Sequence, residues 1–181
     1  MKIYLFLAEG FEEIEAVAPI DIFRRAGIEV VTVSVTGSKL VKGAHAIRIE
    51  ADAIFEEVSF AEDSLLFLPG GLPGTTNLDA HAGLKELILQ KSNEKGILAA
   101  ICAAPSILGK MGLLKGKEVI CYPGFENQLI DASLSENKIV QTDNIFTAKA
   151  AGVAIEFALR IVEEIKGKEV AEKILSAIFL K

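Results

Sequence analysis

The sequence predicts an α/β fold, a doubly wound and mostly parallel sheet with helices on both faces, in one domain that spans residues 1–181. Short runs rich in β-branched residues, leucine and phenylalanine alternate with longer amphipathic stretches along the whole chain. Several of the short runs are continuously apolar, as in strands that helices cover on both faces. The chain has no internal repeat or linker, and its hydrophobic fraction of 51% is sufficient for one substantial core.

The individual elements follow from this alternation in chain order. The first apolar run predicts a strand that leads into an amphipathic helix rich in acidic residues. Gly27 follows Arg24 and Arg25 and predicts the end of this helix, because glycine accepts the left-handed conformation and cations suit the negative end of the helix dipole. The alternating segment 43–52 predicts a small hairpin or an edge strand. We expect strands at 2–7, 28–35, 65–68, 97–101, 119–121 and 145–148, and helices at 12–25, 84–95, 103–111, 153–166 and 169–175.

Composition excludes several classes of protein. The formal net charge of -6 comes from scattered acidic residues, and no cluster of lysine and arginine predicts nucleic acid or an anionic membrane as a partner. The first residues are apolar only briefly and then acidic, unlike a signal peptide, and no run is long enough to span a membrane. Two cysteines without an export signal are expected to remain free thiols in the cytoplasm.

The turn after the run 97–101 carries a candidate nucleophile. In an open parallel sheet, ligands bind beyond the carboxyl ends of the strands, and Cys102 stands directly after this run. Pro105 is typical of a first helical turn, which places Cys102 at a sharp strand-to-helix turn of the kind that presents nucleophiles in hydrolases. Unpaired amides and the positive end of a helix dipole lower the pKa of a thiol, which predicts a reactive thiolate. The alternative is an inert, buried cysteine.

Two other turns carry groups that could act on this cysteine. Glu12 and Glu13 open the first helix, where acidic residues suit the dipole and serve as caps. Glu15 lies on the same face as Glu12, one turn further in, and can point over the sheet. In the turn 68–74, Gly70 and Gly71 let backbone amides approach a bound group. This turn lacks the motifs of a phosphate loop, so it either binds an oxyanion opposite the cysteine or is a plain glycine-rich turn.

The other candidate side chains favour structural roles. Cys121 lies in an apolar run before Tyr122 and is interpreted as a small core residue. His45 and His81 are the two histidines of the chain, and neither is spaced with cysteines as zinc ligands are. We therefore expect no metal and no cofactor, and we place both histidines at the surface.

Together these turns resemble the ThiJ/PfpI superfamily, and most closely its ThiJ/YajL-like branch, which includes the Parkinson disease deglycase. The resemblance extends nearly end to end, through GFEEIEAVAPIDIFRRAGIEV, LPGG, AAICAAPSIL and GVAIEFALRIVEEIKGKEVA. It implies a flavodoxin-like fold and a homodimer, with Asp21 and Arg25 near the dimer contact. It also implies that Cys102 is the nucleophile and that Glu15 is its protonated, hydrogen-bonded partner.

The resemblance further implies the surroundings of the sulfur. The backbone amides of Gly71 and Ala103 are expected to face it from two directions, and Gly70 and Tyr122 to line the substrate pocket. A carboxyl beside a thiolate is disfavoured as an anion both by burial and by like charge, so the implied protonation of Glu15 is physically reasonable.

Three departures from the family pattern affect the expected reaction. PfpI-type peptidases carry a histidine directly after the cysteine, and this chain has Ala103 there. Tyr122 stands where the deglycase brings a histidine toward the cysteine, and His45 stands where an arginine is expected near the interface. Without a nearby histidine, proton transfer depends on Glu15, with Tyr122 or water as further candidates.

These residues support three functional hypotheses. The first is a cysteine-dependent, cofactor-independent enzyme of glyoxalase or deglycase type, which acts on small reactive dicarbonyls or their adducts with Cys102 as nucleophile and Glu15 as acid and base. The second is a redox-responsive stress protein or chaperone that senses oxidation at Cys102. A PfpI-type cysteine peptidase or amidase is the least favoured, and nothing in the residues supports a role in thiamine biosynthesis. The sequence does not identify the physiological substrate or any protein client.

Overall fold

The computed structural model describes residues 1–180 and confirms the predicted α/β fold. Seven strands form one central sheet in the order β10, β11, β7, β6, β1, β2, β5. All neighbours pair in parallel except β10 and β11, which form an antiparallel pair at one edge. The strands are β1 (Lys2–Leu7), β2 (Glu29–Ser34), β5 (Ala53–Ile54), β6 (Ser64–Leu68), β7 (Ile97–Ile101), β10 (Ile139–Thr142) and β11 (Ile145–Ala148).

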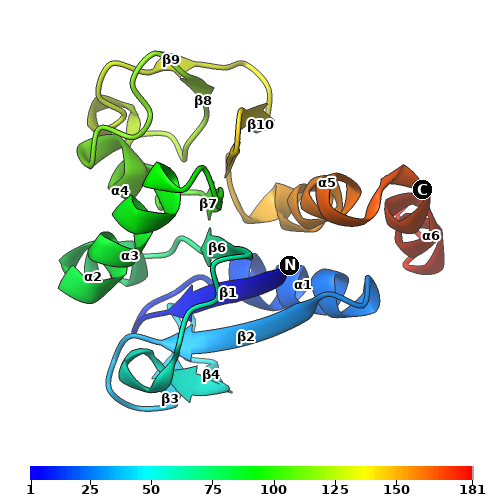
Figure 1. The fold of residues 1–181 in the computed structure, drawn as a ribbon, viewed down its shortest axis with the longest axis horizontal. Coiled ribbons are helices and arrows are strands. Elements are labelled where there is room, and N and C mark those ends of the chain that lie inside the picture. The colour runs from blue at the N-terminus through cyan, green and yellow to red at the C-terminus, as the bar shows by residue number, and fades with distance from the viewer. Residues whose placement is uncertain (181) are drawn as a thin grey trace.

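Helices cover both faces of this sheet, as expected for a doubly wound fold (Figure 1). One layer contains α1 (Glu13–Arg25), α5 (Ala154–Lys166) and α6 (Lys168–Ala177), and the other contains α2 (Gly74–Ala80), α3 (Ala82–Asn93) and α4 (Pro105–Lys110). Side chains of β1 alternate between the two layers: Ile3 and Leu5 pack on the side of α1, and Tyr4 and Phe6 on the opposite side. The continuously apolar strands are therefore buried from both sides, which is the reason the sequence lacks polar alternation there.

Two small strand pairs lie outside the central sheet. The segment predicted as a hairpin or edge strand, 43–52, holds only the second strand of a hairpin: β4 (Arg48–Glu50) pairs antiparallel with β3 (Leu40–Lys42), which begins before the predicted segment. A parallel pair, β8 (Glu118–Val119) and β9 (Ser133–Leu134), follows α4. Short 3-10 turns η1 (Phe55–Glu57), η2 (Glu126–Gln128) and η3 (Ala151–Val153) complete the described elements.

The predicted strand at 119–121 is wrong in extent and in place. Only Glu118–Val119 is extended in a ladder, and this pair does not join the central sheet. The next residues leave the ladder because their amides bond elsewhere: Ile120 donates to Thr147 Oγ1 at 3.1 Å, and Tyr122 donates to the carbonyl of Cys102 at 2.7 Å. This segment therefore supports the loop that carries the candidate nucleophile.

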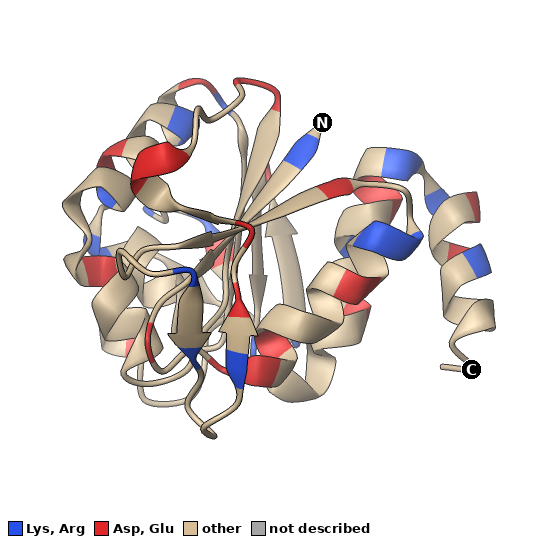
Figure 2. Ribbon diagram, turned by 90° about the horizontal axis from the view of Figure 1, so that it is seen from below, with Lys and Arg blue, Asp and Glu red and all other residues tan. Residues whose placement is uncertain are grey.

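Figure 2 shows that lysine and arginine positions alternate with aspartate and glutamate positions along the helices. Within residues 1–180, no helix is both long enough and apolar enough to cross a membrane. Figure 2 also shows α6 at the periphery of the molecule, where it packs against α5.

Candidate active site

The turns that follow four neighbouring strands converge on one cavity of about 340 Å³. Because β11, β7, β6 and β1 are parallel neighbours, their carboxyl ends meet at the same edge of the sheet. Each strand contributes to the walls through the residues directly beyond it. The cavity is lined by Glu12, Glu15, Gly71, Leu72, Cys102, Ala103, Tyr122, Phe125, Ala150, Ala151 and Gly152.

Cys102 occupies the strand-to-helix turn predicted from the sequence. Its backbone has a φ of 65°, in the left-handed region that L-residues other than glycine rarely adopt. Two backbone hydrogen bonds hold it there: its amide donates to Ala148 at 2.9 Å, and its carbonyl accepts from Tyr122 at 2.7 Å. The strained conformation is therefore fixed by both neighbouring segments, and the side chain is half-buried at the cavity.

Glu15 faces the same point from the first helix, although only 1% of the residue is exposed. Its Oε2 accepts a hydrogen bond of 2.9 Å from the amide of Gly70, and the amide of Ala151 also donates to the carboxyl. Glu12 caps the helix by accepting from the amide of Glu15 at 2.7 Å, as expected for an acidic residue in a first turn. The carboxyl of Glu15 is thus held by two separate loops, and its backbone is held by the cap of its own helix.

Gly70 lies between the thiol and the carboxyl. A Cβ added to Gly70 would lie 2.7 Å from Cys102 Cβ and 2.7 Å from Glu15 Oε2. The two side chains therefore flank a single point that only glycine leaves free. The structure brings Cys102 and Glu15 together as the sequence predicted, and Gly70 acts as a spacer as well as a donor.

The pKa values of both groups are raised in this cavity. Burial raises the pKa of Glu15 to about 7. Burial, together with the charge and hydrogen bond of Glu15, raises the pKa of Cys102 to about 12, against the lowering effect of the amides of Ala103 and Gly71. The expectation of a thiol pKa lowered by the helix is therefore wrong for this pair. Since the two groups interact so closely, they titrate as a unit, and a proton leaving sulfur is most readily accepted by Glu15.

The amides of Gly71 and Ala103 lie at the sulfur, where the resemblance placed them. Gly71 has a φ of 91°, and a Cβ there would approach the amide nitrogen of Glu12 to 2.4 Å, so glycine is required at this turn. Tyr122 lines the cavity with 46% of its surface exposed. Its backbone amide supports Cys102, while a catalytic role for its hydroxyl stays a prediction.

One wall of the cavity was not predicted from the sequence. Ala150, Ala151 and Gly152 follow β11 and close the side opposite the Gly70 turn, and the amide of Ala151 reaches Glu15. These small residues act through their backbone, so no chemically distinctive side chain pointed to them. Their position after a parallel strand was the available signal.

Glu13 and His45 link the first helix to the hairpin. Glu13 is buried and its Oε1 accepts from the amide of His45 at 2.7 Å, while its Oε2 lies 2.8 Å from His45 Nδ1. With Glu12, these side chains offer ligand atoms within 4.8 Å of one another. Because Glu13 already binds the hairpin amides, the cluster is explained by anchoring, and we assign it no metal. Glu13 is therefore an anchor for the hairpin, where capping was expected.

His81 also differs from its predicted surface role. Its ring packs on Phe55 with centroids 4.6 Å apart, and its Nδ1 accepts from the amide of Leu84 at 3.0 Å. It therefore caps the first turn of α3, far from the reacting groups in sequence and outside the walls of the cavity.

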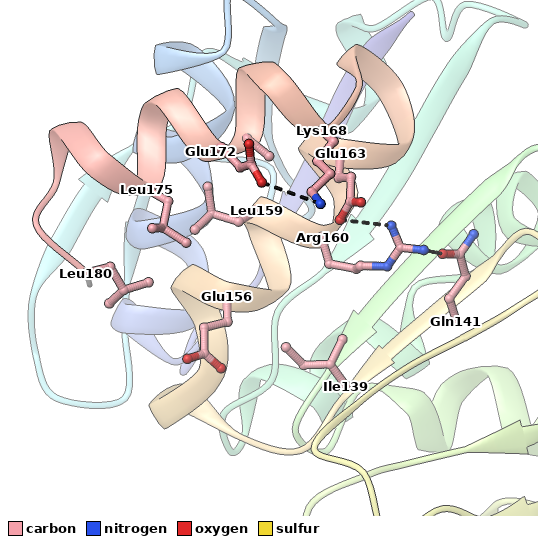
Figure 3. Close-up of a pocket in the computed structure, with 11 residues that line it drawn as sticks. Ile139, Gln141, Glu156, Leu159, Arg160, Glu163, Lys168, Glu172, Leu175 and Leu180 are labelled. Atoms are coloured by element: carbon pink, nitrogen blue, oxygen red, sulfur yellow. Dashed lines mark hydrogen bonds and ion pairs between the residues drawn. The ribbon is translucent and has the colours of Figure 1, made fainter.

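A second cavity, of about 460 Å³, lies between β10, α5 and α6 (Figure 3). Four of its charged side chains form two ion pairs: Arg160 with Glu163 at 3.3 Å and Lys168 with Glu172 at 3.5 Å. No cysteine, serine or histidine is among its lining residues in the described chain. Of these two cavities, the one at Cys102 therefore holds the nucleophile.

The fold and the site define a class of protein: a doubly wound α/β protein with a cysteine on a strand-to-helix turn, a buried carboxyl partner and backbone amides at the sulfur. The sequence profile of the DJ-1/PfpI family matches residues 1–164. The chain belongs to the DJ-1/PfpI family.

Individual relatives match nearly the whole chain. The Parkinson disease protein 7 homolog of Danio rerio is 35% identical over 181 residues, which cover 98% of this chain and 96% of the relative. Glutathione-independent glyoxalase DJR-1.2 of Caenorhabditis elegans is 29% identical over 174 residues, which cover 95% of this chain and 92% of the relative. The structure of oxidized Toxoplasma gondii DJ-1 superposes with a TM-score of 0.93 at 33% identity, over 98% of this chain and 97% of that one.

Proposed function

We propose that this protein is a cysteine-dependent enzyme that acts on small reactive dicarbonyls, such as methylglyoxal, or on their adducts with thiols and amines. The observation that carries the proposal is the meeting of Cys102 and Glu15 in one small cavity, with the amides of Gly71 and Ala103 at the sulfur. The similarity to a relative named as a glutathione-independent glyoxalase supports this class of reaction.

In the first step, Cys102 Sγ attacks the aldehyde carbon of methylglyoxal. A sulfur–carbon bond forms, and the thiol proton passes through the Glu15 carboxylate to the former aldehyde oxygen, which gives a hemithioacetal. A carboxyl whose pKa lies near 7 is well suited to this transfer at neutral pH. The amides of Gly71 and Ala103 stabilise the oxygen while it carries negative charge.

In the second step, Glu15 moves a proton between the two carbons of the adduct. It takes the proton from the carbon bonded to sulfur and returns a proton to the neighbouring carbon, while the hydroxyl proton on the first carbon's oxygen moves to the former ketone oxygen, so that the hemithioacetal becomes a thioester of lactate. Water then cleaves the thioester, which releases lactate and restores the thiol on Cys102. The overall reaction adds one water to methylglyoxal and consumes no external oxidant or reductant.

The direct test compares the conversion of methylglyoxal to lactate by the wild type and by Cys102→Ala, at matched concentration and with buffer controls. We expect turnover by the wild type and none above buffer by the variant. If neither protein differs from buffer, dicarbonyl conversion is not its function. Glu15→Gln separates the roles of the pair: turnover is expected to be lost while Cys102 remains open to alkylation.

A second candidate function is sensing of oxidation at Cys102. The half-buried thiol is surrounded by donors that can hold a sulfinate, and a structural neighbour with 33% identity is described as oxidized. Two equivalents of peroxide would convert the thiol to a sulfinic acid and release two molecules of water. Mild peroxide should then add two oxygen atoms to Cys102 alone and change chaperone activity, and unselective oxidation would exclude this function. The peptidase reading lacks the histidine that it needs beside the cysteine.

We also propose a homodimer and a cytoplasmic location. Ile14 and Val17 expose 55% and 47% of their surface one turn apart on α1, and the Asp21–Arg25 ion pair continues the same helix. An apolar helix face of this kind is more stable when a second copy covers it. The two free cysteines are compatible with a reducing compartment.

A further inference from the structure

Two lysines that form no ion pair within residues 1–180 lie beside the cavity of Cys102. Lys138 and Lys149 line a small cavity of about 210 Å³ together with Ala150, Gly152 and Val153. Ala150 and Gly152 also line the cavity of Cys102, so the two cavities share a wall. A group bound between the lysines would therefore be adjacent to a molecule that reacts at the sulfur.

Backbone hydrogen bonds connect the lysines to the reacting groups. Ala148 accepts from the amide of Cys102 at 2.9 Å, and Lys149 is the next residue in the chain. Two residues further, the amide of Ala151 donates to the carboxyl of Glu15. The segment that carries Lys149 thus contacts both members of the pair through Ala148 and Ala151, and Lys149 itself lines the adjoining cavity.

The lysines are also neighbours of each other across two strands. The amide of Lys149 donates to the carbonyl of Lys138 at 2.9 Å, next to the paired residues Ile139 of β10 and Ala148 of β11. Like charges opposite one another on adjacent strands are unfavourable. The ion pairs formed within residues 1–180 include neither lysine, so no carboxylate of the described chain offsets this repulsion. A bound anion would offset it.

The two lysines differ in charge from the cavity of Cys102, which is lined by acidic side chains. Its own acidic side chains, Glu12 and Glu15, would repel an anionic substrate, and the net charge of the chain is -6. Within these two adjoining cavities, Lys138 and Lys149 are the cationic side chains. A negatively charged substrate would therefore be oriented, with its anionic group toward the lysines and its carbonyl toward Cys102.

We propose that Lys138 and Lys149 bind an anionic group of the substrate, so that the preferred substrate is a small reactive carbonyl compound that carries a carboxylate or a phosphate. The preference for an anionic substrate rests on the proposed function, but the anion site itself does not. It makes the two lysines determinants of specificity, while the bond-forming chemistry stays with Cys102 and Glu15.

The first experiment measures attraction of an anion without requiring turnover. The rates at which iodoacetate and iodoacetamide alkylate Cys102 are compared by mass spectrometry with peptide mapping, in the wild type, Lys138→Met, Lys149→Met and the double variant. Lys173→Met on α6 removes a charge at a distance and is the matched control. We expect the ratio of iodoacetate to iodoacetamide rates to fall about fivefold in the double variant, as for loss of exposed charge interactions. The control should keep the wild-type ratio.

Salt and competing anions define the site further. The difference between wild type and double variant should disappear in about 1 M salt, where charges are screened beyond about 3 Å. Inorganic phosphate and acetate should slow the reaction with iodoacetate in the wild type only, and the more effective of the two identifies the preferred anion. An unchanged ratio in the double variant would overturn the proposal.

The second experiment separates this inference from the proposed function. Turnover of para-carboxyphenylglyoxal is compared with that of neutral phenylglyoxal. We expect the double variant to raise the KM for the charged compound and to leave kinetics on the neutral one unchanged. Equal kinetics of wild type and variant on both compounds would refute the substrate preference while the enzyme reading stands. If the wild type converts neither compound but the alkylation ratio shifts, the proposed function fails and the anion site remains.

Discussion

Replacing Glu15 with glutamine is expected to ionise Cys102 more easily while it abolishes turnover. The pKa of the thiol is raised to about 12 by burial and by the neighbouring carboxylate. Glutamine keeps the size of the side chain but carries no charge, so the repulsion between carboxylate and thiolate disappears. Burial remains, and the amides of Gly71 and Ala103 still favour the anion.

The size of the effect follows from the charge that is removed. Two unit charges about 4 Å apart interact by about 4 kcal/mol at an effective dielectric constant of about 20. One pKa unit corresponds to about 1.4 kcal/mol, so the full interaction is worth about three pH units. Cys102 is only half-buried, and screening at the mouth of the cavity reduces this to about two. The thiol should then titrate near pH 10 instead of near 12.

The assay is the pH dependence of alkylation by iodoacetamide, followed by peptide mapping to separate Cys102 from the buried Cys121. We expect Glu15→Gln to be alkylated faster than the wild type between about pH 8 and 10, where only the variant forms thiolate appreciably. Glu12→Gln removes a carboxylate from the same cavity and is the control, because the charge of Glu12 raises the pKa of Glu15 whereas the charge that raises the pKa of the thiol is that of Glu15.

Slower alkylation of Glu15→Gln than of the wild type would refute this reasoning. That result would mean that Glu15 stabilises the thiolate, as a protonated donor does, and that its negative charge is not the dominant influence. If Cys102 of Glu12→Gln were alkylated as fast as that of Glu15→Gln, the cause would be the total charge of the cavity and not Glu15 itself. The proton transfer proposed above requires the contrast between the two variants.

Three further predictions follow from the same geometry. Because the pKa of Glu15 is raised to about 7 in the folded chain, the folded state holds its proton more tightly than the unfolded one. The stability from this group should fall by about 3 kcal/mol between pH 4.5 and 7, and Glu15→Gln should flatten that part of the urea-unfolding profile. Gly70→Ala should push thiol and carboxyl apart, lower kcat about 100-fold and cost about 1 to 3 kcal/mol in chemical denaturation, whereas wild-type kcat would contradict the tight fit. Val17→Glu should convert the proposed dimer to a monomer in light scattering, and a variant that keeps a dimeric mass would place the interface elsewhere.

Most of the fold was predictable because the strands of the central sheet and the helices that cover it have different patterns of apolar residues. Strands buried on two faces are continuously apolar, and the intervening helices are amphipathic. The strand β10 and the helix α2 were not predicted. β10 is an edge strand with the mixed sequence IVQT, and α2 contains GTTNLDA, which has poor helix formers and no apolar period. Their conformations depend on neighbours that are distant in the sequence.

The candidate site was predictable to the extent that its chemistry is carried by side chains at strand ends. Cys102 and Glu15 were identified in this way, and the structure brings them together. The pKa of the thiol was predicted in the wrong direction, because helix dipoles are visible in the sequence whereas burial and the distance to Glu15 are not. The Ala150–Gly152 wall could not be recognised, since it contributes only backbone groups.

The φ of 65° at Cys102 has a consequence for how this protein can evolve. A residue other than glycine in that conformation costs about 1 to 2 kcal/mol of folding free energy. Substitution by glycine would remove that strain, although it would also add entropy to the unfolded chain. Selection for stability alone therefore gives no reason to retain a side chain at this position. A lineage that no longer used the thiol would therefore be free to exchange it, and the proposed function predicts that lineages which keep the activity keep the cysteine.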